Sequence, residues 1–329
     1  MKTHHFLAIC LIYVLCIFLQ LLFYFSPSGM GMVKKVTIRN GWSNSGIARE
    51  LEQEKFAGWT FQYLWYAFLT DRHNLKAGQY LLGSEESVAE LIRKMAEGRV
   101  LRVKVTFPEG FTSEQMATVL EEEGLCSRNQ YLALVRQPAL FQKKWLAGVE
   151  NLEGFLFPDT YYFSYVQEVH DIILTQIDRF ETMYPGTIDM GKPQNILNTV
   201  VLASIVEKEA REKTEKPLVA SVFLNRLKKN MKLESCATVL YAMYRERGIV
   251  ASVVTLDDVK FPSPYNTYII RGLPPAPICN PGRDSLTAVL HPSPTDYLYF
   301  VLGDQGEHLF SRTFQEHLQN KKKSRKPSQ

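Results

Sequence analysis

The amino-acid sequence predicts a mixed α+β protein that is tethered to a membrane by one N-terminal helix. An apolar run opens the chain, and a strand–turn–helix pattern then occurs twice in its first half. The second half carries two long helical stretches, a proline-rich loop and a short apolar strand. With 329 residues, of which 46% are hydrophobic and 22% charged, the chain can hold an anchor and one or two packed domains.

The apolar run covers residues 6–25 and contains one polar side chain, Gln20. A helix rises ~1.5 Å per residue, so a run of this length spans ~30 Å, the thickness of the hydrocarbon core of a bilayer. A cleaved signal peptide is the alternative, but its apolar segment is normally ~7–15 residues long and ends at a pair of small residues. We therefore expect a cytoplasmic N-terminus at 1–5, a transmembrane helix at 6–25 and a linker at 26–32.

The charges on either side of this run bear on the orientation of the chain. Lys2 precedes the run, whereas Lys34, Lys35 and Arg39 follow it. An excess of positive charge after the span would place the following domain inside the cell. A long folded domain can be translocated in spite of such charges, so the orientation depends on where the substrate lies.

The repeated strand–turn–helix pattern begins at Val36 and again at Val105, 69 positions later. In each copy, alternating apolar residues lead to a glycine and then to a Ser or Thr that can cap a helix with apolar residues at helical spacing. We expect two small α+β lobes within 33–150, and between them a short helix at 87–97 that Gly98 ends. Packing units that bind no ligand would give the same pattern.

Longer helices are expected in the second half of the chain. They cover about 194–212 and about 216–229, with Pro217 in the first turn of the second helix. Residues 152–163 are rich in aromatic side chains but are broken by glycine and proline, which indicates a loop followed by a strand.

Proline keeps most of 261–281 in loop conformation, and 297–301 is typical of a buried strand. We assign 151–318 to one mixed α+β domain. Lysine and arginine are concentrated in 319–329, which we expect to be a solvated basic tail.

Composition and motifs exclude several classes of function. The five cysteines form no C-x-x-C pair, and no H-E-x-x-H occurs, so neither a zinc site nor a disulfide framework is expected. The net charge is +4, and no basic segment interleaved with aromatic residues indicates a nucleic-acid binder. We expect no metal and no cofactor.

Two carboxylates, Glu207 and Glu209, end the first long helix. Paired carboxylates are the usual equipment of glycosidases, but residues two apart on a helix point about 200° apart and cannot flank one sugar bond. Glu209 continues the face that carries Thr199, Leu202, Ile205 and Val206. Apolar neighbours raise the pKa of a carboxyl, as a general acid requires. Two solvated charges that balance the nearby lysines and arginine are the alternative.

Eight segments follow one another in an order that resembles a known family. They are LKAGQY from Leu75, PEGFT from Pro108, LEGFLFPDTYYF from Leu152, ASIVEKE from Ala203, FLNRLKKNMKL from Phe223, YNTY from Tyr265, GLPPAPICNPG from Gly272 and YLYFV from Tyr297. Together they resemble the endolytic murein transglycosylase (MltG, or YceG-like) family over nearly all of the chain after the apolar run. The resemblance implies that Glu209, the second carboxylate of ASIVEKE, is catalytic and that region 33–150 is LysM-like.

The resemblance also implies a reaction. Such a lyase cleaves the MurNAc-β-1,4-GlcNAc bond of nascent glycan strands without water and leaves 1,6-anhydroMurNAc ends, which helps to terminate strand elongation. Glu209 would protonate the leaving oxygen and then take the proton of the MurNAc C6 hydroxyl, so one carboxylate is enough. The implied partners are peptidoglycan strands, with penicillin-binding proteins and the elongation machinery as candidates. The catalytic domain would lie outside a plasma (inner) membrane that the chain crosses once.

Further residues are candidates for substrate binding. Tyr265, Asn266, Thr267 and Tyr268 lie in the proline-rich loop, where they could stack on sugars and form hydrogen bonds with them. Asn225, Arg226 and Glu207 complete the set. Turn residues in the loop and a surface pair on the helix are the structural alternatives.

One departure from the family pattern bears on activity. Where the family has Asp-Pro, this chain has Cys236-Ala237, and a weakly active, peptidoglycan-binding scaffold for the synthesis machinery is the alternative function that the departure favours. No histidine signal accompanies Cys236 as a nucleophile. A cytosolic aminodeoxychorismate lyase would need pyridoxal phosphate on a lysine, for which no sequence context is visible.

Overall fold

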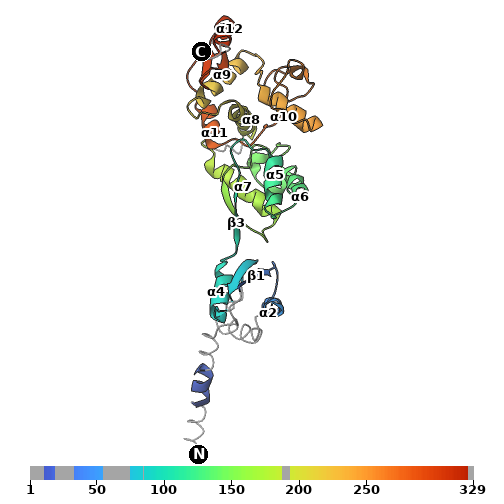
Figure 1. Ribbon diagram of the computed structural model, residues 1–329, viewed down its shortest axis with the longest axis vertical. Coiled ribbons are helices and arrows are strands. Elements are labelled where there is room, and N and C mark those ends of the chain that lie inside the picture. Colours follow the sequence, from blue (N-terminus) through green and yellow to red (C-terminus); the bar gives the residue numbers. More distant parts are fainter. Residues whose placement is uncertain (1–10, 19–32, 55–74, 84, 187–192, 325–329) are drawn as a thin grey trace, which may run out of the picture. The chain divides into compact units, whose positions relative to one another are not determined.

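A computed structural model of the chain describes residues 11–18, 33–54, 75–83, 85–186 and 193–324 (Figure 1). The chain divides into two compact units. Unit 1 comprises residues 1–104 and 162–168, and unit 2 comprises residues 105–161 and 169–329. Each unit has its own hydrophobic core.

Most of the expected membrane span lies outside the described residues. This applies to residues 6–10 and 19–25, and equally to the expected cytoplasmic N-terminus and linker. Residues 11–18 are helical, and their side chains are exposed. Among the helices that the structure describes, none has both the length and the apolar character needed to cross a bilayer.

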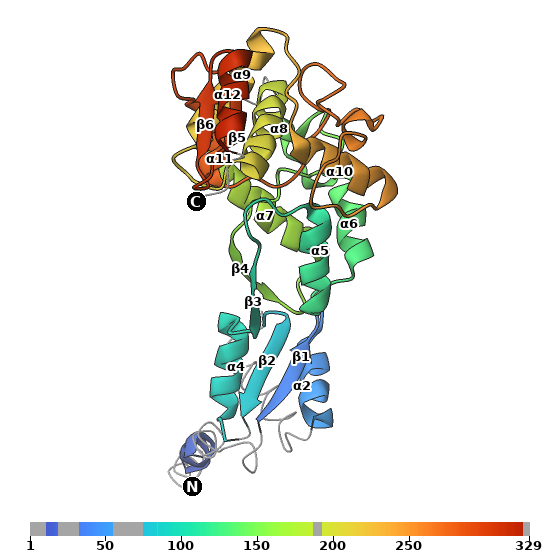
Figure 2. The ribbon, with the colours of Figure 1, turned by 45° about the horizontal axis from the view of Figure 1, so that its top comes forward.

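Unit 1 is built on an antiparallel pair of strands, β1 (Val33–Ile38) and β2 (Gly78–Gly83). Figure 2 shows helices α2 (Asn44–Gln53) and α4 (Val88–Glu97) beside these strands. Alternate strand residues turn inward against one face of each helix. The core consists of Val36, Ile38, Ile47, Ala48, Leu51, Tyr80, Leu82, Leu91, Ile92 and Met95.

The helix ends in unit 1 are those that the sequence predicts. Ser43 accepts a hydrogen bond from the Gly46 N–H, and Ser87 caps α4 in the same way. At the other end of α4, Gly98 has a φ of 72°, in the left-handed region where a Cβ is unfavourable. The first copy of the repeat and the helix at 87–97 are therefore confirmed.

The second copy of the repeat forms as expected, but its helix lies in unit 2. Strand β3 (Arg102–Thr106) pairs with β4 (Thr160–Ser164), and Thr112 caps α5 (Ser113–Glu122) in a capping box with Gln115. The N–H of Gly110 donates to the carbonyl of Asn280, which joins this segment to the part of the chain assigned to catalysis. Compact unit 2 therefore includes residues 105–150 together with the region that follows.

The remaining elements belong to unit 2. They are α6 (Arg128–Val135), α7 (Val169–Met183), α8 (Pro193–Glu209), α9 (Lys216–Lys228), α10 (Cys236–Arg247), α11 (Arg283–Leu290), β5 (Tyr299–Leu302), β6 (His308–Ser311), α12 (Phe314–Lys323) and short 3-10 turns at Pro138–Phe141, Lys144–Leu146 and Asp258–Lys260. Helix α8 lies at the centre of this unit, in contact with α9, α10 and α11 (Figures 1 and 2).

Helix α8 differs from the expected helix with one apolar stripe. All residues from Val200 to Val206 are buried, because α9, α10 and α11 pack around it. The helix also ends at Glu209, three residues earlier than expected. Helix α9 begins at Lys216 with a proline in its first turn, as predicted.

The C-terminal elements correct two expectations. Strand β5 is half-buried and not buried, because it forms a two-stranded hairpin with β6. Residues 319–323 of the expected basic tail continue helix α12, which Thr313 and Glu316 start with a capping box. Residues 325–329 of the tail lie outside the described part of the chain.

Candidate active site

Glu209 is the last residue of α8, and its carboxyl meets the beginning of α10. The Ser235 hydroxyl donates a hydrogen bond to Glu209 Oε1 at 2.5 Å, and the backbone N–H of Ala237 donates to the same carboxyl. The residue as a whole is partly exposed. The two donors hold its carboxyl in one orientation.

Several groups set the pKa of Glu209. Burial raises it, and this is the largest effect. The hydrogen bond from Ser235, the electrostatic effect of His308 and the N–H of Ala237 act in the opposite direction, but the net pKa of Glu209 stays above the ordinary value. A raised pKa lets a carboxyl carry a proton closer to neutral pH, as a general acid must.

His308 itself is held by a second carboxylate. The backbone N–H of His308 donates to Glu215 Oε1 at 2.8 Å, and its Nδ1 lies 2.6 Å from Glu215 Oε2. His308 lies at the start of β6 and Glu215 just before α9. Sequence reasoning missed Ser235 and His308 because long stretches of chain separate them from Glu209, and it missed Glu215 because the partner of Glu215, His308, is just as distant.

Glu207 points to a different part of the structure, as its spacing from Glu209 predicts. Both of its oxygens lie 3.1 Å from Nζ of Lys216, and Oε2 accepts hydrogen bonds from the Gly282 N–H and the Ser285 hydroxyl. The Glu207 and Lys216 side chains are only 8% and 3% exposed. Glu207 thus ties α8 to α9 and α11, and this geometry supports neither the predicted substrate contact nor a solvated charge.

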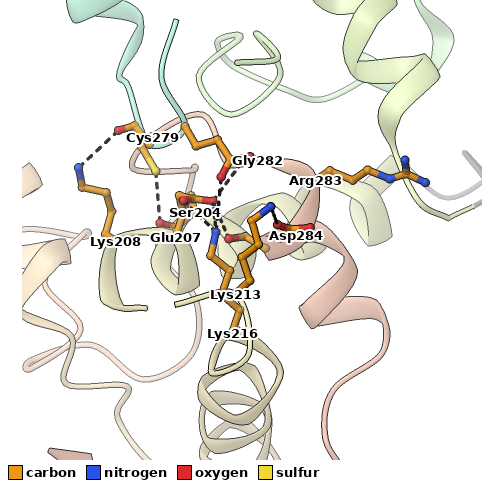
Figure 3. A network of polar contacts seen from close by, with 12 residues as sticks. Ser204, Glu207, Lys208, Lys213, Lys216, Cys279, Gly282, Arg283 and Asp284 are labelled. Carbon is orange, nitrogen blue, oxygen red and sulfur yellow. Dashed lines mark hydrogen bonds and ion pairs between the residues drawn. The ribbon is translucent and has the colours of Figure 1, made fainter. Parts of the chain in front are cut away.

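Figure 3 shows how further polar contacts fasten α8 around this ion pair. Ser204 Oγ accepts a hydrogen bond from the Ile278 N–H, and the Cys279 thiol donates to the Ser204 carbonyl. Nζ of Lys208 donates to the Gly110 carbonyl. These bonds fix the end of α8 from several sides, so the position of Glu209 is set by the surrounding fold.

A second buried carboxyl, Glu153, lies in the core of unit 2. It accepts hydrogen bonds from the Ser113 N–H, the Ser113 hydroxyl and Nδ2 of Asn280. Asn280 Oδ1 in turn accepts from the N–H groups of Gly154 and Leu156. Burial raises the pKa of Glu153 to about 7. This network joins the motifs that begin at Leu152 and Gly272 to Ser113, the residue that follows PEGFT.

Two of the loop residues expected to contact sugar are instead fully buried. Asn266 donates to the carbonyls of Val259 and Phe261 and accepts from the Tyr268 N–H. Thr267 Oγ1 accepts from the N–H of Ser235. Asn266 therefore braces its own loop, and Thr267 holds Ser235, which binds Glu209; neither side chain reaches solvent.

The two tyrosines of the loop differ in exposure. Tyr265 is buried against Tyr241, with the Arg245 guanidinium 4.9 Å from the centre of its ring. Tyr268 is half-buried, and its hydroxyl lies 3.1 Å from Cys236 Sγ. Burial, Cys236 and the negative charge of Glu209 raise the pKa of Tyr268. Tyr268 is thus the loop residue best placed to meet a sugar near Glu209.

Asn225 and Arg226 brace neighbouring segments. Asn225 Nδ2 donates to the carbonyls of Thr295 and Tyr297. Arg226 donates to the carbonyls of Leu298, Lys232 and Leu233 and forms an ion pair with Glu234. Arg226 thus holds the turn that leads to Ser235, whereas Asn225 holds the segment that precedes β5. Both side chains are engaged by the fold.

The Cys236-Ala237 departure leaves Glu209 well supplied with donors. Cys236 is exposed and lies beside Tyr268. Ala237 provides a backbone N–H to Glu209, which a proline at this position would lack. With Cys236-Ala237 at these positions, Glu209 still receives a backbone hydrogen bond, and Cys236 contacts Tyr268.

Comparisons with known proteins identify the family of this chain. A sequence profile of the YceG-like family matches residues 36–323. The chain is 31% identical over 306 residues to the endolytic murein transglycosylase of Bacillus subtilis (strain 168), which covers 88% of this chain and 84% of the relative. It is 27% identical over 315 residues to the endolytic murein transglycosylase of Streptococcus pneumoniae R6, but spans only 57% of that protein.

A solved structure gives the same assignment. The crystal structure of a yceG-like protein from Listeria monocytogenes superposes with a TM-score of 0.58 at 32% identity, over 88% of this chain and 99% of that one. The profile and the Bacillus relative each extend over most of this chain. The family resemblance of the sequence motifs is confirmed: the chain belongs to the YceG-like family.

Proposed function

We propose that this protein is an endolytic lytic transglycosylase of peptidoglycan, with Glu209 as its acid and base. The proposal rests on the Glu209 carboxyl, whose pKa is raised by burial and which is held in place by hydrogen bonds from Ser235 and Ala237. The names of the relatives from Bacillus and Streptococcus support the same activity.

The reaction follows from this geometry. Protonated Glu209 donates its proton to the glycosidic oxygen as the bond to the MurNAc anomeric carbon breaks, and the bonding electrons stay with that oxygen. The resulting carboxylate then takes the proton of the MurNAc C6 hydroxyl. The C6 oxygen forms the new bond to the anomeric carbon, which closes the 1,6-anhydro ring and returns Glu209 to its protonated state.

The surroundings of Glu209 favour this lyase over a hydrolase. A hydrolase needs a second carboxyl to act as nucleophile or to activate water. Glu207 is paired with Lys216, Glu215 is engaged by His308, and Glu153 is enclosed by hydrogen bonds from Ser113 and Asn280. A hydroxyl of the substrate is therefore the nucleophile that this site suits.

Cleavage in water enriched in oxygen-18 tests the proposal. Purified glycan strands incubated with the full chain should give fragments with 1,6-anhydroMurNAc ends that carry no label. Fragments with labelled reducing ends would show hydrolysis and contradict the proposed chemistry. Absence of any cleavage would leave a binding scaffold as the better account.

The alternative functions have less support. A pyridoxal phosphate lyase needs a free lysine, but the buried Lys216 is engaged by Glu207 and lies 3.6 Å from Glu109. A scaffold was favoured by the Cys236-Ala237 departure, and Ala237 nonetheless supplies a donor to Glu209.

We further propose that the apolar run at 6–25 anchors the chain in the plasma membrane and that unit 1 is a LysM-like glycan-binding unit. The length of the run and the strand–helix pattern of β1 and α2 support these two points. Wall synthases such as penicillin-binding proteins would then be partners at the outer face. A reporter that is active only outside the cytoplasm should be active when fused after Gln329, and activity of a cytoplasmic reporter alone would contradict this orientation.

A further inference from the structure

Unit 2 contains a cavity of about 580 Å³ that Glu209 does not line. Its walls come from the first turn of α5, from α6, from the segment around Glu150 and from the second half of α10. Ser113, Glu153, Leu132 and Val135 are the buried lining residues, whereas Arg136, Glu150 and Arg245 are exposed at its edge. Pockets of 300–1,000 Å³ with a few convergent polar groups are typical of ligand sites.

The charged residues around this cavity differ in whether they have a partner. Glu114 is paired with Arg128, and Glu153 is enclosed by hydrogen bonds. In the part of the chain that the structure describes, Arg136 and Glu150 form no ion pair, whereas Arg245 donates to the Tyr241 hydroxyl and lies over the Tyr265 ring. The Arg136 guanidinium is therefore available to a carboxylate, which such a group binds in a fork geometry, and Arg245 adds a second positive charge at the same edge.

Helix α10 connects this cavity with the candidate active site. Its first turn supplies the Ala237 N–H to Glu209, and its residues Tyr241, Tyr244 and Arg245 line the cavity. At ~1.5 Å per residue, these three side chains start ~6–12 Å further along the helix. A substituent on a glycan strand bound at Glu209 would cover a distance of this order.

We propose that the cavity binds the peptide stem of the glycan strand. Arg136 and Arg245 hold a stem carboxylate, and Glu150 faces its amine. The tyrosines offer hydroxyl groups and flat apolar faces to the peptide. This assignment rests on the proposed function, because the stem reaches the cavity only if the strand to which it is attached lies at Glu209.

Direct binding tests the cavity without cleavage. The synthetic stem L-Ala-γ-D-Glu-L-Lys-D-Ala is titrated calorimetrically into the detergent-solubilised full chain carrying Glu209→Gln. We expect saturable binding that Arg136→Ala weakens about tenfold, the typical cost of about 1.4 kcal/mol for one charged contact. Arg93→Ala is the matched control, since Arg93 is a surface arginine of α4 paired with Glu90. Absence of binding, or equal binding by Arg136→Ala, overturns the proposal.

Cleavage separates this proposal from the proposed function. Wild-type protein should cut stem-bearing strands faster than strands stripped of their peptides by an amidase. The ratio of these two cleavage rates should be smaller in Arg136→Ala and unchanged in Arg93→Ala. If both kinds of strand are cut equally, the cavity assignment fails and the catalytic one stands. If neither is cut although the peptide binds at Arg136, the catalytic assignment fails and the cavity assignment stands.

Discussion

The Ser235 hydroxyl donates to Oε1 of Glu209 across 2.5 Å, and this hydrogen bond joins the end of α8 to the start of α10. Ser235 is itself held through its backbone N–H by Thr267. The candidate catalytic carboxyl therefore depends on a chain of contacts that begins in the proline-rich loop.

Replacement of Ser235 by alanine should change the pH dependence of cleavage. The hydrogen bond from Ser235 favours the ionised form and lowers the pKa of Glu209, so its loss raises that pKa further. Activity that requires protonated Glu209 falls as pH rises through this pKa. The alkaline limb of the kcat/KM profile should therefore move to higher pH in Ser235→Ala, with a lower maximum, because the carboxyl is less well oriented.

Ser235→Thr, which keeps the hydroxyl, is the control and should restore the wild-type profile. A limb that moves to lower pH in Ser235→Ala would contradict the assignment of this hydrogen bond to the carboxylate form.

The buried pair of Glu207 and Lys216 should control stability. Glu207→Gln leaves the Lys216 ammonium buried beside an amide, and loss of one partner of such a pair costs about 3–5 kcal/mol. The double variant Glu207→Gln, Lys216→Met removes the charge that was left uncompensated and should recover part of the loss. Urea unfolding of wild type, Glu207→Gln, Lys216→Met and the double variant measures this, and additive effects of the two substitutions would exclude a coupled pair.

Gly154 should be the glycine of unit 2 that tolerates alanine least. Its φ is +91°, and an added Cβ would lie 2.5 Å from Pro277 Cγ and 2.7 Å from Val200 Cγ1. Gly148 has a φ of +82° with no atom within 4 Å of an added Cβ. Gly148→Ala isolates the backbone strain, which costs about 1 kcal/mol, and Gly154→Ala should cost about 1–3 kcal/mol more through overpacking. Equal melting temperatures of the two variants would contradict the packing around Gly154.

Stability should fall as pH rises toward and above neutrality because of Glu153. Its pKa is raised from 4.5 to about 7 in the folded chain, so the folded state binds more protons than the unfolded state between these values. The contribution is fully present below the unfolded pKa and is lost as pH rises through the folded pKa, a loss of about 3 kcal/mol. Glu153→Gln should flatten this dependence between pH 5 and 8 in thermal melts, and an unchanged slope would contradict the burial of Glu153.

Local signals in the sequence predicted much of the fold, because they depend on neighbouring residues. The caps at Ser43 and Gly98 were found from residue type and spacing alone. Helical spacing also predicted that Glu207 and Glu209 point in different directions. The apolar stripe that was used to choose Glu209 as the catalytic carboxyl was incomplete, because other helices surround α8. A helix buried on all sides leaves little periodicity to detect.

Contacts between segments that are distant along the chain could not be predicted from the sequence. Ser235 and His308 influence Glu209, and Asn280 joins Glu153, over separations that no local pattern encodes. The polar residues of the 265–268 loop resembled sugar ligands, yet Asn266 and Thr267 serve the fold. Their complete burial in the folded chain shows that Asn266 and Thr267 are structural residues and not sugar ligands. The sequence alone does not reveal this burial.

The role of Glu209 is tested most directly by the products that purified glycan strands give with wild-type protein and with Glu209→Gln. The amide keeps the size of the side chain but cannot deliver a proton to the glycosidic oxygen, so anhydro-ended fragments should appear with the wild type and be absent with the variant. Circular dichroism and melting should show both proteins folded. Anhydro-ended fragments formed by a folded Glu209→Gln at a rate near that of the wild type would contradict the assignment of Glu209 as the catalytic acid and base.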